Sequence, residues 1–161
     1  MYQKENKLLD FNVMDIQQYQ QNRHPLLFVD YVEEVIPGKS AKGFKNFSYN
    51  EWFFPAHFVD EPNVPGFVQL ESLTQMFLMT FLTLPDNKMK KTAFVSIKNA
   101  SFKKKIIPGN RLDIQAELKI YSRGLASGVS VGYINGELAC NVDLVIAIPD
   151  IIKGFKPVQC V

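Results

Sequence analysis

The chain has few of the residues that build disulfide frameworks and metal centres. Its 161 residues include two cysteines, Cys140 and Cys160, and two histidines, His24 and His57. Two cysteines cannot form a disulfide framework, and these four residues lack the spacing of a zinc site. The first residues are polar and lack the apolar region of a signal peptide. We therefore expect reduced thiols, a cytoplasmic location and no bound metal.

A large excess of one charge is also absent, because the formal net charge is only +2. This balance disfavours a dedicated nucleic-acid-binding protein. The most apolar run, residues 67–84, is interrupted by Gln69, Glu71 and Gln75, whereas a membrane span needs ~20 predominantly apolar residues. A hydrophobic content of 47% is that of a packed protein, and no repeat or linker divides the chain. We expect one domain over residues 1–161 and no membrane span.

The hydrophobic pattern predicts one buried helix and a set of strands. Residues 66–84 carry apolar side chains in almost every direction around a helix axis, which is typical of a helix buried on all sides. Runs rich in β-branched and aromatic residues, each ended by a turn signal, are predicted to be strands at residues 26–36, 41–49, 92–107, 112–121, 125–134 and 137–148.

The remaining segments are shorter or irregular. Residues 10–21 are expected to form a short amphipathic helix, and three prolines between residues 50 and 65 exclude long regular structure there. Asn135-Gly136 is a strong hairpin signal, because both residues tolerate positive φ. The expected fold class is α+β, with an antiparallel sheet around one central helix.

Two segments resemble catalytic motifs but lack residues that those motifs need. Residues 38–40 (Gly-Lys-Ser) look like the end of a phosphate-binding loop, but the glycine required five residues earlier is Glu33, and no helix follows. Residues 128–132 (Gly-Val-Ser-Val-Gly) match a nucleophile elbow, but no histidine follows them. We interpret the first segment as a turn and the second as a strand with small residues at a bulge.

One set of residues has the chemistry of an acid–base site. His57 lies in an aromatic, proline-bounded loop, and Glu71 lies inside the apolar helix. Burial disfavours an ionised carboxylate, so the pKa of Glu71 should rise, and a carboxylic acid beside a histidine suits acid–base catalysis near neutral pH. The helix that begins at Pro65-Gly66 has free N–H groups and a dipole that favour an anion.

Each of these residues also has a purely structural explanation. A histidine in an apolar loop commonly serves as a hydrogen-bonded packing residue, and the helix dipole favours an early glutamate whatever its function. Gln75, four residues after Glu71 on the same helix face, either orients the carboxyl group or is a polar residue at an interface. Residue type and spacing leave both explanations open.

Several motifs occur in an order and at a spacing that match one family. They lie at residues 22–30, 37–39, 50–58, 62, 65–66, 71–75, 94–97, 102–103 and 107–110. Over about residues 14–148 the chain resembles the bacterial β-hydroxyacyl-acyl carrier protein dehydratases of fatty-acid synthesis, and residues 149–161 form a tail. The resemblance implies the hot-dog fold, a curved antiparallel sheet around one long helix. It also implies a homodimer with shared active sites, often assembled as a trimer of dimers.

The resemblance assigns the site residues. His57 of one protomer would remove the C2 proton of a 3-hydroxyacyl thioester, Glu71 of the partner subunit would protonate the departing hydroxyl group, and the Gly66 N–H would bind the thioester oxygen. The resemblance implies no metal or redox cofactor, and it implies that the substrate is carried on the phosphopantetheine of acyl carrier protein. The acyl tunnel would be lined by Phe58, Pro65, Phe67, Gln75 and Phe94.

Several positions depart from the family pattern, and four of them lie in or next to the predicted site. Ala56 replaces the glycine before the histidine, Val59 and Asp60 replace the Pro-Gly pair after it, and Phe67 replaces a small aliphatic residue. The bulk of Phe67 is expected to shorten or redirect the acyl tunnel, which favours a specialised dehydratase. These departures leave open a non-catalytic subunit that binds acyl thioesters or acyl carrier protein. A related hot-dog thioesterase is a further alternative.

Residues 86–111 are strongly basic. They hold seven lysines, Arg111 and one acid, Asp86, which gives a local net charge of +7. A basic stripe steers acidic partners, and the resemblance implies that acidic acyl carrier protein docks near the tunnel mouth. The alternative is a solvated strand face, where lysines also block edge pairing. The predicted docking residues are Lys98, Lys103, Lys104, Lys105 and Arg111.

Overall fold

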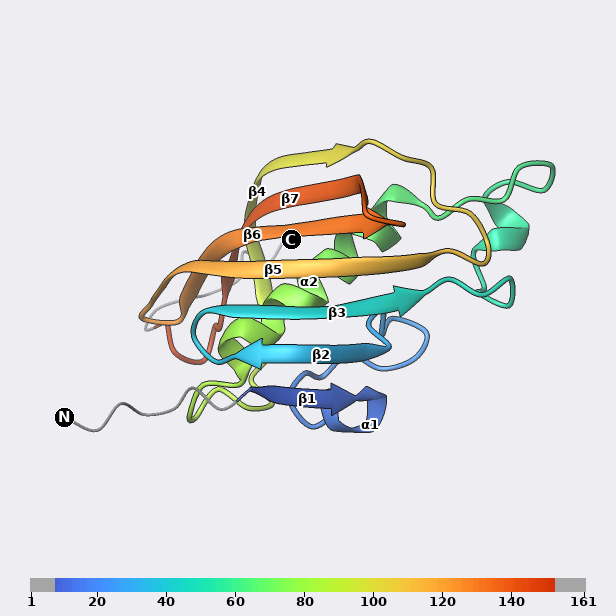
Figure 1. The fold of residues 1–161 in the computed structure, drawn as a ribbon. Coiled ribbons are helices and arrows are strands. Elements are labelled where there is room, and N and C mark those ends of the chain that lie inside the picture. The colour runs from blue at the N-terminus through green and yellow to red at the C-terminus, as the bar shows by residue number, and fades with distance from the viewer. Residues whose placement is uncertain (1–7, 153–161) are drawn as a thin grey trace, which may run out of the picture.

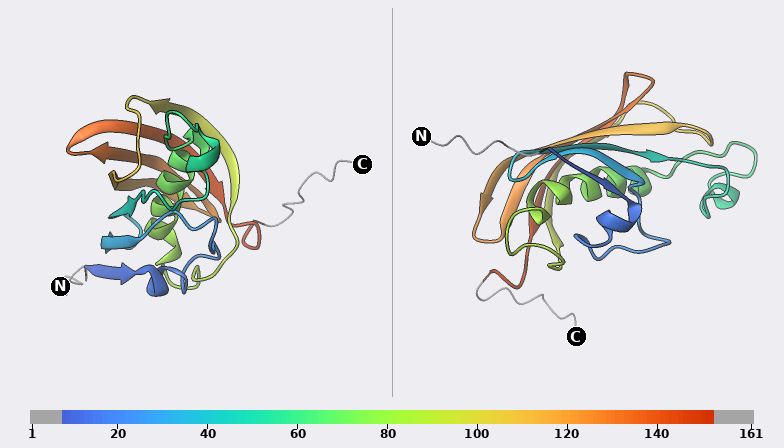
Figure 2. Two further views of the ribbon diagram at one scale, coloured as in Figure 1. Left: turned by 90° about the vertical axis from the view of Figure 1, so that its right-hand side faces the viewer. Right: turned by 60° about the horizontal axis from the view of Figure 1, so that its bottom comes forward.

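The computed structural model describes residues 8–152, and its main feature is one antiparallel sheet of seven strands. The sheet curves around a single long helix, α2 (Gly66–Leu82) (Figure 1, Figure 2). The strand order is β1-β2-β3-β5-β6-β7-β4. The strands are β1 (Leu9–Asn12), β2 (Tyr31–Ile36), β3 (Ser40–Asn46), β4 (Ala93–Phe102), β5 (Arg111–Ser122), β6 (Leu125–Ile134) and β7 (Glu137–Ala147). The α+β hot-dog arrangement predicted from the sequence is confirmed.

Two short helices, α1 (Val13–Ile16) and η1 (Phe54–Ala56), complete the fold. The segment predicted to be irregular contains only η1, and the Asn135-Gly136 hairpin between β6 and β7 is present with both residues at positive φ. Residues 153–161 of the expected tail, with Cys160, lie outside the described residues. Between residues 8 and 152, no helix is long and apolar enough to cross a membrane.

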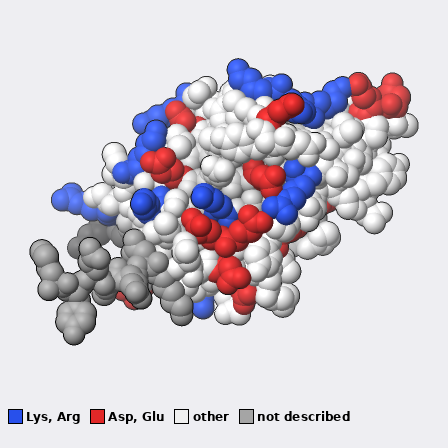
Figure 3. Space-filling model, in the orientation of Figure 1, with Lys and Arg blue, Asp and Glu red and all other residues white. Residues whose placement is uncertain are grey.

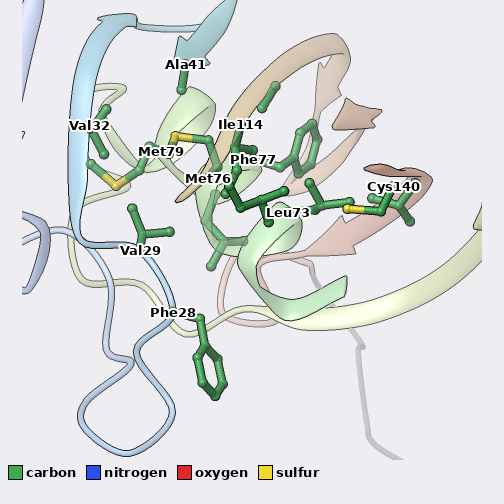
Figure 4. Close-up of a cluster of buried hydrophobic side chains, with 14 of the residues drawn as sticks. Phe28, Val29, Val32, Ala41, Leu73, Met76, Phe77, Met79, Ile114 and Cys140 are labelled. Atoms are coloured by element: carbon green, nitrogen blue, oxygen red, sulfur yellow. The ribbon is translucent and has the colours of Figure 1, made fainter. Parts of the chain in front are cut away.

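The core lies between α2 and the concave face of the sheet. Leu73, Met76 and Phe77 of α2 are almost fully buried in one cluster with Val32 and Ile114 (Figure 4). Complete burial of each such side chain contributes about 1.5–3 kcal/mol. Because the sheet curves around the helix and the segment before β2 covers another side, α2 is buried on nearly all sides, as its apolar composition predicts.

Gly128 marks a close approach between α2 and the sheet. A Cβ atom there would lie 2.6 Å from the Phe77 ring and 2.1 Å from the Glu117 carbonyl oxygen, so only glycine fits. The register of β5 against β6 is irregular just opposite, between Leu118 and Ile120. The interpretation of this segment as a strand with small residues at a bulge is confirmed.

The predicted helix over residues 10–21 is wrong. The first of these residues pair with β2 as β1, and the helical part is limited to α1. Beyond α1 the chain turns, and the Arg23 guanidinium donates to the backbone carbonyls of Gln17 and Gln20 at 2.8 Å each. The pairing of β1 with β2 and the hydrogen bonds from the Arg23 side chain therefore override the local amphipathic pattern.

The strand predicted over residues 26–36 begins only at Tyr31, which is a second correction. The Phe28 N–H and the Leu26 carbonyl both bind the side-chain amide of Gln75, at 2.7 Å each, so they are not available to a sheet. The predicted strands that became β3 and β4 likewise end before their expected boundaries.

Candidate active site

Glu71 lies in the second turn of α2, half-buried, and two amides hold its carboxyl group. Its Oε1 accepts from Gln75 Nε2 at 2.8 Å and from Asn22 Nδ2 at 3.4 Å. Gln75 is fully buried, and its remaining amide groups bind the Leu26 carbonyl and the Phe28 N–H. These partners fix the orientation of the Gln75 amide, so Gln75 must donate to Glu71. No hydrogen bond to the second carboxyl oxygen occurs among residues 8–152.

Burial raises the pKa of Glu71 above its ordinary value of 4.5. The hydrogen bond from Gln75 acts in the opposite direction, because it stabilises the carboxylate, but desolvation is the larger effect. A raised pKa keeps a larger fraction of Glu71 protonated near neutral pH. The carboxyl group can therefore donate a proton, as a general acid must.

His57 follows η1 directly, in the loop that leads to α2. Its Nδ1 lies 3.0 Å from the carbonyl oxygen of Asn63. A carbonyl oxygen can only accept, so the neutral imidazole carries its proton on Nδ1 and leaves Nε2 unprotonated. The ring of Phe58 stacks on the imidazole, with 4.2 Å between the ring centroids. Nε2 is thus the atom that can act as a base.

The backbone that holds the imidazole is clamped to α2. Val64 donates its N–H to the Ile106 carbonyl at 2.8 Å, and its own carbonyl accepts from Gln69 Nε2 at 3.0 Å. The Val64 N–H and the Asn63 carbonyl belong to one planar peptide unit, so this clamp also fixes the acceptor of the His57 proton. The sequence marks Gln69 only as a polar interruption of an apolar helix, and that interruption is the signal that points to it.

The amino-terminal end of α2 offers two free backbone donors. Pro65 caps the helix, and its carbonyl accepts from the N–H groups of Val68 and Gln69, at 3.0 and 3.1 Å. The N–H groups of Gly66 and Phe67 have no acceptor in the described part of the chain. Because they lie at the positive end of the helix dipole, they can stabilise a negative charge that develops nearby.

An apolar hollow of about 390 Å³ opens beside Glu71. Its walls are Asn22, Leu26, Phe28, Phe67, Leu70, Glu71, Phe94 and Ile97. A smaller hollow of about 110 Å³ adjoins it and shares Asn22, Glu71 and Phe94. Of the predicted tunnel residues, Phe67 and Phe94 line the larger hollow. Gln75 lies behind Glu71 instead, and Phe58 and Pro65 lie with His57 and the start of α2.

One chain does not bring Glu71 and His57 together. Neither hollow that Glu71 lines has His57 or Gly66 among its walls. The strand that forms one wall, β4, lies at the edge of the sheet and is exposed along nearly its whole length. Phe94 and Ile97 are 47% and 44% exposed. An edge strand with large exposed apolar side chains is typical of a surface that pairs with another chain.

Basic side chains gather where β4 ends, beside acidic side chains at the tip of a neighbouring loop (Figure 3). Lys104 forms an ion pair with Glu137, and Lys105 forms one with Glu61, which lies in the loop after His57. Lys103 has no ion pair among residues 8–152. These three lysines therefore form one group close to the loop that carries the imidazole.

The other two predicted docking residues lie apart from this group. Lys98 lines a shallow pocket with Ile120 and Leu125, toward the opposite end of the sheet. Arg111 donates to Glu33 at 2.8 Å and to Asp113 at 2.6 Å, and its guanidinium lies 3.8 Å from the centroid of the Phe44 ring. The structure therefore gathers three of the five residues.

The described residues offer no alternative centre for metal or thiol chemistry. No group of three or more His, Cys, Asp or Glu side chains that could hold a metal ion occurs among residues 8–152. Cys140 is buried and unpaired, and burial raises the pKa of its thiol to about 12. A thiol with so high a pKa forms almost no thiolate near neutral pH, so it is a poor nucleophile.

Comparison with known proteins identifies the family. Residues 21–148 match the FabA-like domain. The 3-hydroxyacyl-[acyl-carrier-protein] dehydratase FabZ of Clostridium novyi is 35% identical over 136 residues, which cover 84% of this chain and 96% of that protein. The FabZ of Geobacillus thermodenitrificans is 37% identical over 141 residues, covering 86% and 97%. The solved dehydratase heterocomplex ApeI:P of Xenorhabdus doucetiae has a TM-score of 0.72 at 15% identity, covering 83% and 90% of the two chains. The chain belongs to the FabA-like family.

Proposed function

We propose that the protein dehydrates (3R)-3-hydroxyacyl-acyl carrier protein to the trans-2-enoyl thioester, in the synthesis of fatty acids or of a specialised acyl chain. The observation that carries this proposal is the half-buried Glu71 carboxyl group, oriented by Gln75 at the wall of an apolar hollow. An acid with a raised pKa in such a hollow suits proton donation to a leaving hydroxyl group. The FabZ relatives are dehydratases of this class, which supports the same reaction.

The reaction begins when Nε2 of His57 removes a proton from C2 of the acyl group. The hydrogen bond from Nδ1 to Asn63 keeps Nε2 free and stabilises the imidazolium that forms. Negative charge develops on the thioester oxygen, where the Gly66 N–H and the dipole of α2 stabilise it. One such backbone donor is typically worth ~10²–10³-fold in rate.

Glu71 completes the reaction by protonating the 3-hydroxyl group as the C3–O bond breaks and water leaves. The electron pair of the former C2–H bond becomes the C2–C3 double bond, and the C2 proton stays on His57. Loss of that proton to solvent and reprotonation of Glu71 restore both groups. The proposed chemistry requires no metal or redox cofactor, and the acyl group is carried on the phosphopantetheine of the carrier protein.

The proposed site needs a second copy of the chain. His57 of one protomer would act with Glu71 of the partner subunit, which agrees with the absence of His57 from both hollows beside Glu71. Two β4 edges, paired about a two-fold axis, would continue the sheet across the dimer and cover Phe94 and Ile97. A homodimer is the smallest assembly that completes the site, and a trimer of dimers would preserve it.

The carrier protein would dock, in the cytoplasm, on the basic group after β4. Lys103, Lys104 and Lys105 lie next to the loop of His57, so a carrier bound there would present its thioester to the imidazole. An acidic carrier surface would take the place of Glu61 and Glu137 as counter-ions. Lys98 and Arg111 would contribute to long-range attraction.

Turnover by matched variants tests the proposal. His57→Ala and Glu71→Gln should each lower the rate of enoyl formation from 3-hydroxybutyryl carrier thioester by ~10²–10⁴-fold. His24→Gln and Glu117→Gln change an exposed residue of the same type and should leave the rate within about twofold. A folded protein that binds acyl carrier protein without dehydrating any chain length would be a binding subunit. Hydrolysis of the thioester in place of dehydration would indicate a thioesterase.

A further inference from the structure

The groove that begins near the start of α2 continues along the helix to its other end. Three hollows follow one another along it. From α2, the first is lined by Phe67, Leu70 and Glu71, the second by Glu71, Thr74 and Leu78, and the third by Leu82. These positions recur at intervals of three and four residues, so they form one stripe on one face of the helix.

The two other walls follow the same order. The chain around β4 runs in the reverse direction, with Ile97 and Phe94 in the first hollow, Phe94, Ala93 and Thr92 in the second, and Thr92, Lys91 and Lys90 in the third. Asn22 lines all three hollows. Because neighbouring hollows share wall residues on more than one side, they form one continuous groove. At ~1.5 Å of rise per residue, Leu82 lies about 16 Å beyond Glu71.

The groove changes from apolar to polar and basic along its length. The third hollow, of about 300 Å³, has Leu82 as its single apolar wall. Its other walls are Gln20, Gln21, Asn22, Lys90, Lys91 and Thr92. No acidic side chain lines it, and neither lysine forms an ion pair with a carboxylate of residues 8–152. Gln20 is 1% exposed, and its Oε1 has no hydrogen-bond partner within that range.

The two lysines are held at this end of the groove by contacts of the preceding loop. The Met89 N–H donates to the Tyr19 carbonyl at 2.9 Å, and Gln21 Nε2 donates to the Met89 carbonyl at 2.7 Å. The Lys88 ammonium lies 4.8 Å from the centroid of the Tyr19 ring. The backbone that leads to Lys90 is therefore fixed to the segment that forms the opposite wall.

The entry point of the acyl chain follows from the proposed function, on which this inference rests. In the shared site the thioester at Gly66 of one protomer lies beside Glu71 of the other, so the acyl chain enters the groove next to Glu71. From Glu71 the groove continues through the second hollow toward Leu82. We infer that the third hollow binds the far end of the acyl chain, and that this end carries a carboxylate. A methyl end would gain little among amides and ammonium groups, whereas a carboxylate would pair with Lys90 and Lys91.

Matched substrates test the inference directly. Pairs of 3-hydroxyacyl carrier thioesters over a series of chain lengths would end either in a methyl group or in a carboxylate. For chains long enough to reach the third hollow, we expect kcat/KM to favour the carboxylate by about tenfold, the effect of one charge-assisted hydrogen bond. Lys90→Met with Lys91→Met should abolish this preference, while Lys39→Met with Lys119→Met, two lysines outside the groove, should preserve it.

Two results would overturn the inference: equal or better turnover of the methyl-ended chain at every length, or a preference that survives in the Lys90→Met, Lys91→Met protein. The 3-hydroxybutyryl thioester is too short to reach the lysines, so its turnover separates this test from the proposed function. If that substrate is inert, the binding of unreactive acyl-pantetheine amides is measured instead. The amide with a terminal carboxylate should then bind about tenfold more tightly than the methyl-ended amide of the same length. Lysine variants that weaken binding only when the pantetheine carries its phosphate would assign the hollow to that phosphate instead, and would contradict the inference.

Discussion

Gln75 joins the acid of the site to the fold, and Gln75→Leu removes all three of its side-chain hydrogen bonds while keeping a buried side chain of similar size. The Phe28 N–H, which is almost fully buried, would lose its acceptor at a cost of ~1–3 kcal/mol, and the lost bond to the Leu26 carbonyl adds about 1 kcal/mol. We expect the free energy of unfolding to fall by about 2–4 kcal/mol. For a domain of this size the melting temperature would fall by roughly 5–15 °C.

The same variant should change the pH dependence of catalysis. The bond from Gln75 lowers the pKa of Glu71, so its loss lets that pKa rise further. Glu71 acts in its protonated form, so the alkaline limb of the kcat/KM profile should move to higher pH. Gln17→Leu, which removes only exposed side-chain hydrogen bonds, is the control for urea unfolding and for the profile. A Gln75→Leu protein as stable as this control, with the wild-type alkaline limb, would refute the reasoning.

Three further predictions concern the imidazole, the carboxyl group and the buried thiol. Gln69→Met should lower kcat about tenfold with little change in KM. ¹⁵N spectra of the two histidines should show that His57 loses its Nδ1–H form. An unchanged spectrum would contradict the role of the hydrogen bond between Gln69 and Val64. Glu71→Gln should stabilise the protein at neutral and alkaline pH. The stability that protonated Glu71 contributes is fully present below its ordinary pKa of 4.5, and it is lost as the pH rises through the higher pKa of the folded state. A stability difference that does not vanish at acid pH would be inconsistent with this. In a Cys160→Ser protein, the high pKa of the Cys140 thiol should slow its alkylation at pH 8 about a thousandfold relative to the unfolded chain. Rapid alkylation of Cys140 in the folded protein would disprove its burial.

Local patterns were sufficient for the elements whose residues carry their own signals. The apolar run that forms α2 is recognisable without knowledge of its partners, because burial on all sides leaves no polar face. Asn135 and Gly136 define a hairpin because the turn needs only two residues that tolerate positive φ. Each of these signals lies within one short window of the chain.

Long-range hydrogen bonds decided the segments that local patterns could not predict. Residues 26–29 have the composition of a strand, yet their backbone binds Gln75, which lies far along the chain. The same limit applies to the site. Residue type and family resemblance pointed to His57 and Glu71, but the clamp by Gln69 and the polar end of the groove at Lys90 arise only when separate segments meet in the fold.

The central claim is that one active site takes His57 from one protomer and Glu71 from the partner subunit. Mixed dimers test it most directly: His57→Ala and Glu71→Gln proteins, each inactive alone, are unfolded together and refolded as a mixture. A shared site predicts one intact site in every mixed dimer, and about a quarter of the wild-type activity if assembly is random. A mixture as inactive as its two components, although mixed dimers have formed, would show that both residues act within one chain.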